Sequence, residues 1–223
     1  MKNIIVFIII IIIQLNIFAI LNIGIALTEP FAYFEETNDG YLLKGIDINI
    51  IKLLSKDLDE KINIYIYSFP DLLEKGLNNM DIIIGGIHIT EERKKFINFS
   101  IPYLTTGLVI LKLKGSENIN KFAVKRNSTG HITVKKWTEE GKNIDYIVYE
   151  TNEECLNSLL NKKVDGAFFD LFNAIWISKK YPVEIYGEPL TKNDIGIGVK
   201  DRNLLEKINM LIIKYRNDNL IGE

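Results

Sequence analysis

The chain has 223 residues, with 27 Lys and Arg against 29 Asp and Glu, two His and one Cys. This length suits one large domain or two small lobes. The 47% hydrophobic and 25% charged fractions are typical of a globular protein with a core, and they exclude a disordered chain. A net charge of −2 without a long basic run argues against nucleic-acid binding. The single Cys155 excludes an intrachain disulfide and a thiolate metal cluster.

The first twenty residues predict a secretion signal. Lys2 precedes ten consecutive apolar residues, 4–13, which suits a signal peptide and falls short of the about 20 residues of a membrane span. Ala19 is a small residue that marks a cleavage point. Apolar residues resume over 17–21, so an uncleaved anchor stays open as the alternative. No cysteine lies near the cut, which excludes a lipid-modified N-terminus. We therefore expect a periplasmic or otherwise extracytoplasmic protein.

The first half of the chain alternates between short strands and longer helices. Helical spacing of apolar residues, strict alternation and one continuous apolar run distinguish the two kinds of element. We predict strands over 21–27, 62–67 and 81–87, and helices over 46–59, 70–79 and from Thr90. This β-α-β-α-β order is typical of an α/β fold, a parallel sheet with helices on both faces.

The second half repeats the alternation after a polar stretch, 115–130. Thr151 and Glu154 form a capping box at the start of a helix. We predict a strand over 107–114, a second α/β set that begins at 131–135, strands over 145–150, 164–169, 182–186 and 195–199, and helices over 151–161, 171–180 and from 203. The chain would cross between two lobes near 104–110 and 184–194. The predicted lobes are 21–106 with 190–223, and 107–189.

Two charged residues follow predicted strands at the edge where open α/β sheets bind ligands. They are Arg93 and Asp170, and His88 lies near Arg93 in the sequence. A guanidinium matches a carboxylate with two parallel hydrogen bonds, and a carboxylate accepts bonds from an ammonium. Facing each other on opposite lobes, they would hold a zwitterion and favour hinge closure. The alternatives are a surface Arg93 paired with Glu91 or Glu92, and an Asp170 that only caps the following helix.

Four stretches of the chain resemble a known family. They read E-P-F at 29–31, G-I-D-I-N-I at 45–50, M-D-I-I-I-G-G-I-H-I-T-E-E-R at 80–93 with F-S-I-P-Y at 99–103, and V-D-G-A-F-F-D at 164–170. With these motifs the chain from about residue 21 resembles the extracytoplasmic amino-acid-binding proteins of ABC transporters, bacterial solute-binding protein family 3. The resemblance implies the two-lobed periplasmic-binding-protein type II fold. Each lobe would be a mostly parallel sheet flanked by helices, and two crossover hinge strands would join the lobes.

The resemblance also implies roles for individual residues. Arg93 would pair with the α-carboxylate of the ligand and Asp170 with its α-amino group. The Gly86 N–H and residue 88 would line the same pocket, and Phe69 would be one wall of an aromatic sandwich. The predicted ligand-binding set is Arg93, Asp170, Gly85, Gly86, His88, Phe69, Thr28, Glu29, Trp137 and Thr138.

Several of these positions depart from the family pattern. Thr28 or Glu29 stands where an aromatic residue is usual, and His88 stands where Ser or Thr is common. The second-lobe turn that often reads Gly-Thr-Thr is 136–138, Lys-Trp-Thr, so Trp137 is a candidate for the missing aromatic wall. His88 is a pocket donor, a pH-sensitive contact or a packed strand end. Phe69 and Trp137 have core packing as their alternative, and Glu29 is either solvated or selects a cationic side chain.

The function that this resemblance implies is capture of a polar amino acid by hinge closure and delivery to the membrane permease of an ABC importer. We expect a monomer without enzymatic activity, cofactor or metal. One alternative is a cyclohexadienyl-dehydratase-like enzyme, for which only His88 and Glu29 could serve as acid or base. Asp170 argues against it, because a prephenate-like dicarboxylate has no ammonium. The other alternative is a ligand-sensing domain on an uncleaved anchor.

Overall fold

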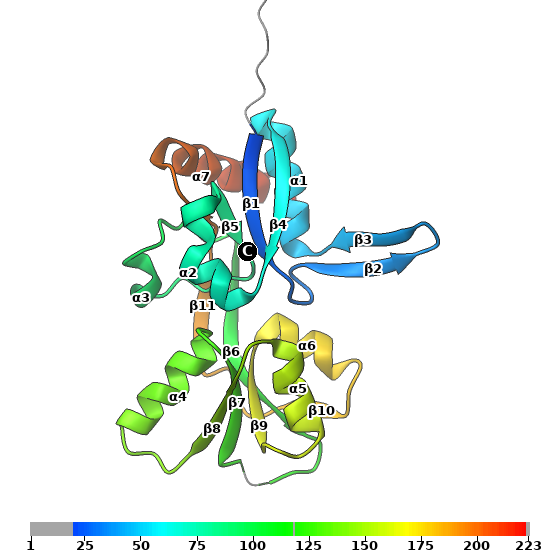
Figure 1. The fold of residues 1–223 in the computed structure, drawn as a ribbon, viewed down its shortest axis with the longest axis vertical. Coiled ribbons are helices and arrows are strands. Elements are labelled where there is room, and N and C mark those ends of the chain that lie inside the picture. The colour runs from blue at the N-terminus through cyan, green and yellow to red at the C-terminus, as the bar shows by residue number, and fades with distance from the viewer. Residues whose placement is uncertain (1–19, 118, 222–223) are drawn as a thin grey trace, which may run out of the picture.

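The computed structural model describes residues 20–117 and 119–221. Of the predicted secretion signal, only Ile20 belongs to this described part. Two lobes lie one above the other along the long axis of the molecule, and each is built around its own sheet (Figure 1). Within the described ranges, no helix has the length and apolarity that crossing a membrane requires.

Lobe 1 contains a four-stranded sheet in the order β12-β5-β1-β4. Strand β1 pairs in parallel with β4 and β5, and β12 runs antiparallel to β5. The strands are β1 (Ile20–Ala26), β4 (Lys61–Tyr67), β5 (Ile82–Ile84) and β12 (Gly198–Val199), and the helices are α1 (Ile46–Leu58), α2 (Phe69–Asn79), α3 (Glu91–Lys94) and α7 (Arg202–Asn217). Ile82 and Ile84 pack with α1 and α7, whereas Ile83 packs with α2. The apolar run of β5 is thus buried on both faces of the sheet.

Lobe 2 contains a six-stranded sheet in the order β10-β6-β9-β7-β8, with β11 also paired to β6. Strand β7 is parallel to β8 and β9, and β6 is antiparallel to β9, β10 and β11. The strands are β6 (Leu104–Leu113), β7 (Lys121–Lys125), β8 (Asp145–Tyr149), β9 (Gly166–Asp170), β10 (Val183–Ile185) and β11 (Thr191–Ile195), and the helices are α4 (Thr129–Glu139), α5 (Asn152–Leu160) and α6 (Leu171–Ser178). Helices α5 and α6 share one apolar cluster with the sheet, and α4 packs in the other.

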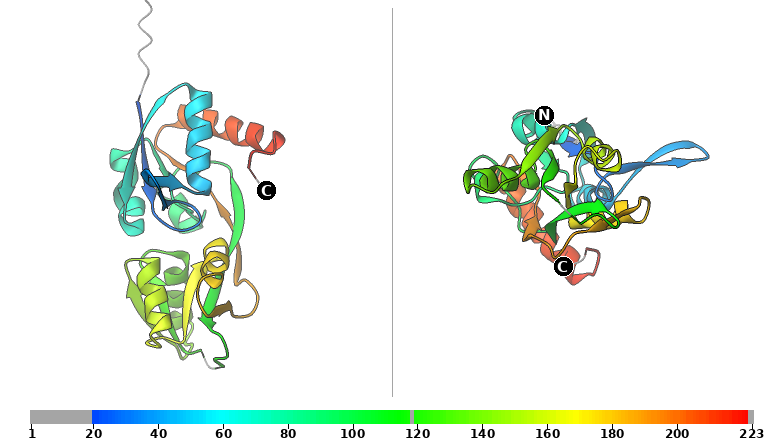
Figure 2. Two further views of the ribbon diagram at one scale, coloured as in Figure 1. Left: turned by 90° about the vertical axis from the view of Figure 1, so that its right-hand side faces the viewer. Right: turned by 90° about the horizontal axis from the view of Figure 1, so that it is seen from below.

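Strands β6 and β11 connect the two lobes (Figures 1 and 2). They pair antiparallel from Ile195 opposite Leu104 to Thr191 opposite Leu108. Gly107 lies in this paired segment, where a Cβ atom would stand only 2.6 Å from the Thr191 carbonyl oxygen. Both crossings therefore form one two-stranded connection, in the regions where the sequence predicts them.

Two predicted elements differ in the structure. Residues 131–135 lie inside helix α4, so the prediction that a second α/β set begins there is wrong. The first strand of that set is β7, which lies within the polar stretch 115–130. The β-branched residues Ile132, Thr133 and Val134 favour a strand, but the Ser128 side chain accepts a hydrogen bond from the His131 N–H and caps a helix there.

The expectation of a continuous strand over 195–199 is also wrong. Strand β11 ends at Ile195 and pairs with β6, whereas Gly198–Val199 forms the separate strand β12 on β5. A further element has no counterpart in the predictions. Strands β2 (Tyr33–Thr37) and β3 (Gly40–Lys44) form an antiparallel hairpin that projects from lobe 1 (Figure 1).

Candidate functional site

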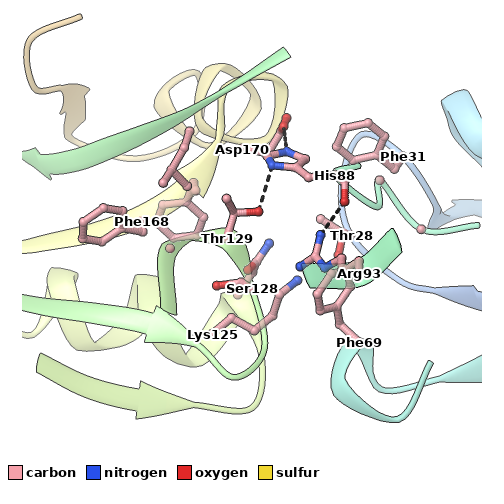
Figure 3. A pocket seen from close by; sticks show the side chains of 16 residues that line it. Thr28, Phe31, Phe69, His88, Arg93, Lys125, Ser128, Thr129, Phe168 and Asp170 are labelled. Atoms are coloured by element: carbon pink, nitrogen blue, oxygen red, sulfur yellow. Dashed lines mark hydrogen bonds and ion pairs between the residues drawn. The ribbon is translucent and has the colours of Figure 1, made fainter. Parts of the chain in front are cut away.

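A small cavity lies between the lobes, where strands β1, β5, β7 and β9 end (Figure 3). Its volume is about 50 Å³, which holds only a few water molecules, since one water needs about 10–15 Å³ of such space. Seven of the ten predicted site residues line it: Thr28, Phe69, Gly85, Gly86, His88, Arg93 and Asp170. The carboxyl-end rule for open α/β sheets thus locates most of this set.

Arg93 is a buried guanidinium that faces the cavity. Its backbone N–H bonds to the side chain of Thr90, the N-cap of α3, and the residue is only 3% exposed. Nη1 donates to the His88 carbonyl at 2.8 Å, and Nη2 donates to the Asn127 carbonyl of lobe 2 at 2.9 Å. Within the described part of the chain it forms no ion pair with a carboxylate, so the alternative of a surface Arg93 paired with Glu91 or Glu92 is wrong.

Burial lowers the pKa of Arg93 to about 10, and this value keeps the group charged at neutral pH. A buried charge without a counter-ion is costly. The two bonds to backbone carbonyls use two of the five guanidinium N–H donors. Arg93 therefore retains both the charge and the donors to receive an anion.

Asp170, the last residue of β9, lines the same cavity as Arg93 from the other lobe. Its Oδ1 accepts from the Phe172 N–H at 2.9 Å and caps helix α6. Its Oδ2 lies 2.9 Å from Nε2 of His88. The carboxylate is thus the N-cap of a helix and also lines the cavity, so capping does not remove it from the candidate site.

His88 joins the two lobes across the cavity (Figure 3). Its Nδ1 lies 2.9 Å from Oγ1 of Thr129 in lobe 2, while Nε2 contacts Asp170. Because an ionised carboxylate can only accept, Nε2 donates to Asp170, and in a neutral imidazole Nδ1 then accepts from the Thr129 hydroxyl. His88 is therefore a cavity residue and not merely a packed strand end.

The Gly85-Gly86 turn is held by a buried carboxylate of helix α1. The Gly86 N–H donates to Oδ2 of Asp47 at 2.9 Å, and the Tyr103 hydroxyl donates to Oδ1 at 2.6 Å. Burial raises the pKa of Asp47 to about 7. Gly86 adopts a φ of 60°, a left-handed conformation in which a side chain would be strained. The Gly86 backbone lines the cavity, but its N–H is bonded to Asp47.

Three predicted site residues lie elsewhere. Glu29 lines a second cavity of about 530 Å³ and pairs with Lys180 at 3.3 Å. Trp137 and Thr138 do not line the cavity between the lobes. The Trp137 ring packs on Phe122 and Phe168, with centroids 6.0 and 5.6 Å apart, and the Thr138 hydroxyl donates to the Val134 carbonyl inside α4.

The second-lobe turn at the cavity is instead the segment that joins β7 to α4. Ser128 of this segment lines the cavity together with Thr129 and Gly130, the first two residues of α4. The error follows from the missed strand β7, because an alignment that starts the second α/β set at 131 places the turn after it several residues too late.

Lys125 is the charged cavity residue that the sequence analysis missed. It is the last residue of β7 and 7% exposed. Its Nζ lies 4.0 Å from the centroid of the Phe69 ring of lobe 1. Burial is the main cause that lowers its pKa to about 8, with Arg93 as a further, smaller cause in the same direction. Recognition of β7 would have exposed it, since it stands at the carboxyl end of a parallel strand as Asp170 does.

Two α/β lobes, a two-stranded connection and opposed charged groups in the gap between them define a two-lobed binding protein whose lobes can close around a small molecule. The family model of bacterial extracellular solute-binding proteins, family 3, matches residues 21–222. The chain belongs to this family. The type II fold that the sequence motifs imply is thereby confirmed.

Individual relatives are similar over most of their length. The chain is 25% identical over 213 residues to ABC transporter arginine-binding protein 1 of Escherichia coli (strain K12), covering 89% of this chain and 86% of that protein. It is 29% identical over 199 residues to the ABC transporter glutamine-binding protein GlnH of Bacillus subtilis (strain 168), covering 81% and 71%. The arginine-bound form of truncated ArgBP from T. maritima superposes with a TM-score of 0.79 at 27% identity, covering 88% of this chain and 96% of that one.

Proposed function

We propose that this protein is an extracytoplasmic receptor that binds a polar amino acid between its lobes and delivers it to the permease of an ABC importer. One observation carries the proposal. Arg93 and Asp170, a buried cation and an anion, face the same cavity from opposite lobes. The guanidinium would bind the α-carboxylate and Asp170 the α-ammonium. The relatives are binding proteins of ABC transporters by name, which supports a receptor without catalytic turnover.

Binding requires the lobes to separate first. The cavity of about 50 Å³ is too small for an amino acid, and His88 of lobe 1 reaches across it to Asp170 of lobe 2. Rotation about β6 and β11 would open it, and the ligand would then replace direct contacts between the lobes with its own. The N-terminal secretion signal and the lobe boundaries 21–106 with 190–223 and 107–189 belong to the same proposal.

Titration calorimetry against the twenty L-amino acids tests the proposal. We expect saturable binding of one or a few of them, and Arg93→Ala should weaken it roughly 30-fold or more, since loss of one partner of a buried charge pair costs about 2–5 kcal/mol. Arg93→Lys should retain part of the affinity, because it keeps the charge and loses the planar fork. Arg202→Ala, at the exposed first residue of α7, is the matched control and should bind normally.

Two results would contradict the proposal. The first is the absence of binding to every amino acid by a protein whose unfolding transition is intact. The second is consumption of prephenate, which would support the dehydratase alternative. An Arg93→Ala variant that keeps its fold and its affinity would remove the carboxylate role from Arg93.

A further inference from the structure

The cavity is lined by more cationic side chains than the α-carboxylate of an amino acid can pair with. Two cationic side chains, Arg93 and Lys125, face it, and among the described lining residues Asp170 is the carboxylate. A bound amino acid would pair its α-carboxylate with one cation and its α-ammonium with Asp170. One cationic side chain of the cavity then has no partner in the α-amino and α-carboxylate groups, and the side chain of the ligand is the remaining group that can pair with it.

Lys125 is placed to be that second cation. Figure 3 shows it reaching from lobe 2 toward Phe69 of lobe 1. The Phe69 ring attracts the ammonium by its π face, but a lysine ammonium also has three N–H donors. In the described part of the chain, no side-chain or backbone oxygen accepts a hydrogen bond from its Nζ. The residue is 7% exposed and lines the cavity, so a group bound there is placed to accept from these donors.

We infer that the ligand of this site is an amino acid whose side chain ends in a carboxylate or a primary amide, and that Lys125 receives the oxygen of that group. The inference rests on the proposed function and names its substrate class. An acceptor oxygen on the ligand would pair with the buried donors of Lys125, which no protein oxygen in the described part of the chain receives. A cationic side chain would instead bring a third positive group beside Lys125 and Arg93.

The second cavity is the competing location for a cationic side chain. It adjoins the first through Thr28 and Asn152, which line both, and it contains Glu29 and Glu153. The Glu29 carboxylate is already paired with Lys180 and half-exposed. A long cationic side chain would have to pass through the first cavity, beside Lys125, to reach the half-exposed Glu29 carboxylate. Because arginine-binding proteins are among the relatives, the experiment has to distinguish a cationic ligand side chain in the second cavity from an acidic or amide side chain at Lys125.

The test measures binding of L-glutamate, L-glutamine, L-arginine and L-norvaline by titration calorimetry. Norvaline has the chain length of glutamate with a methyl group in place of the carboxylate. We expect glutamate or glutamine to bind at least tenfold more tightly than norvaline and arginine. Lys125→Met should reduce this preference over norvaline about tenfold and leave norvaline binding within twofold of wild type. Lys121→Met, at the first residue of the same strand and outside the cavity, should leave all four affinities unchanged.

A pH series gives a second readout. Burial lowers the pKa of Lys125 to about 8, so raising the pH from 7 to 9.5 should remove its charge and lower the ratio of glutamate affinity to norvaline affinity. Both ligands carry the same α-ammonium, so the ratio cancels the titration of that group. Arg93, Asp170 and Cys155 are the groups that influence Lys125, and Lys125→Met retains all three, so its ratio should stay flat. Tightest binding of arginine, or an unchanged preference in Lys125→Met, would overturn the inference and leave the proposed function standing. Absence of binding to all amino acids would overturn both.

Discussion

His88 uses an acceptor that the proposed ligand also needs. Its Nε2 contacts Oδ2 of Asp170, while Oδ1 is engaged by the Phe172 N–H at the start of α6. The carboxylate oxygen that remains open to an incoming ammonium is therefore shared with His88. A histidine at this position makes a direct lobe-to-lobe contact at the expense of ligand contact.

Replacement of His88 by Ser should therefore strengthen ligand binding. Ser is too short to reach Asp170, so the ammonium would no longer displace a hydrogen bond worth about 1 kcal/mol. We expect the affinity for the best amino acid ligand to rise about fivefold, as measured by titration calorimetry. Weaker binding by a stably folded His88→Ser protein would show that the imidazole contacts the ligand itself.

The cavity residues divide into those that the sequence could locate and those that it could not. Arg93 and His88 follow the continuous apolar run of β5, and Asp170 ends the apolar strand β9, so their positions at the sheet edge were predictable. Lys125 was not predictable, because its strand reads K-F-A-V-K within a polar stretch, and Thr129, which follows that strand, was missed with it. Three central apolar residues are too short a signal to separate a strand from a loop.

Among the elements, helix α1 holds the turn after β5 through Asp47. This buried carboxyl bonds to the Gly86 N–H and to the Tyr103 hydroxyl, and its pKa is raised by burial to about 7. Since the folded pKa lies above the ordinary aspartate value of 3.8, the native state binds more protons than the unfolded state between these two pH values. Raising the pH through this window therefore lowers the contribution of Asp47 to stability.

Asp47→Asn should remove this pH dependence while its side chain keeps an acceptor for Gly86 and a donor for Tyr103. The free energy of unfolding of the variant, relative to wild type, should rise between pH 4 and pH 7.5. The rise should be on the order of a few kcal/mol at about 1.4 kcal/mol per pKa unit. Urea denaturation at both pH values measures it, and taking the difference from wild type cancels the other titrating groups. A constant difference would show that Asp47 stays ionised.

Strand β11 and the hairpin of β2 and β3 are strands because of their pairing and not because of burial. Residues of β11 read T-K-N-D-I, a polar pattern that favours a loop, yet five residue pairs along β6 hold it as a strand. The hairpin of β2 and β3 is likewise mostly exposed. Helices α1 and α7 were predictable because each buries one apolar stripe.

At the scale of the whole molecule, β6 and β11 approach each other so closely that the connection has no room for a side chain at Gly107. A Cβ atom would stand 2.6 Å from the Thr191 carbonyl oxygen, so the strands would have to move apart. Gly107→Ala should destabilise the protein by about 1–3 kcal/mol, as overpacking does, and lower its thermal midpoint. It should also change ligand affinity from a distance, because the connection sets the relative orientation of the lobes. Unaltered stability and affinity would show that closure does not depend on this contact.

The antiparallel pairing of Leu108 with Thr191 has a consequence for engineering. The polypeptide enters and leaves lobe 2 at adjacent positions, so this lobe is a cassette inserted into the other, and insertions succeed where the two chain ends lie close together. A short turn that joins 108 to 191 should yield a miniature of lobe 1. Replacing lobe 2 by the corresponding lobe of a relative should exchange Lys125 and its neighbours in one step, and the ligand specificity should change with them.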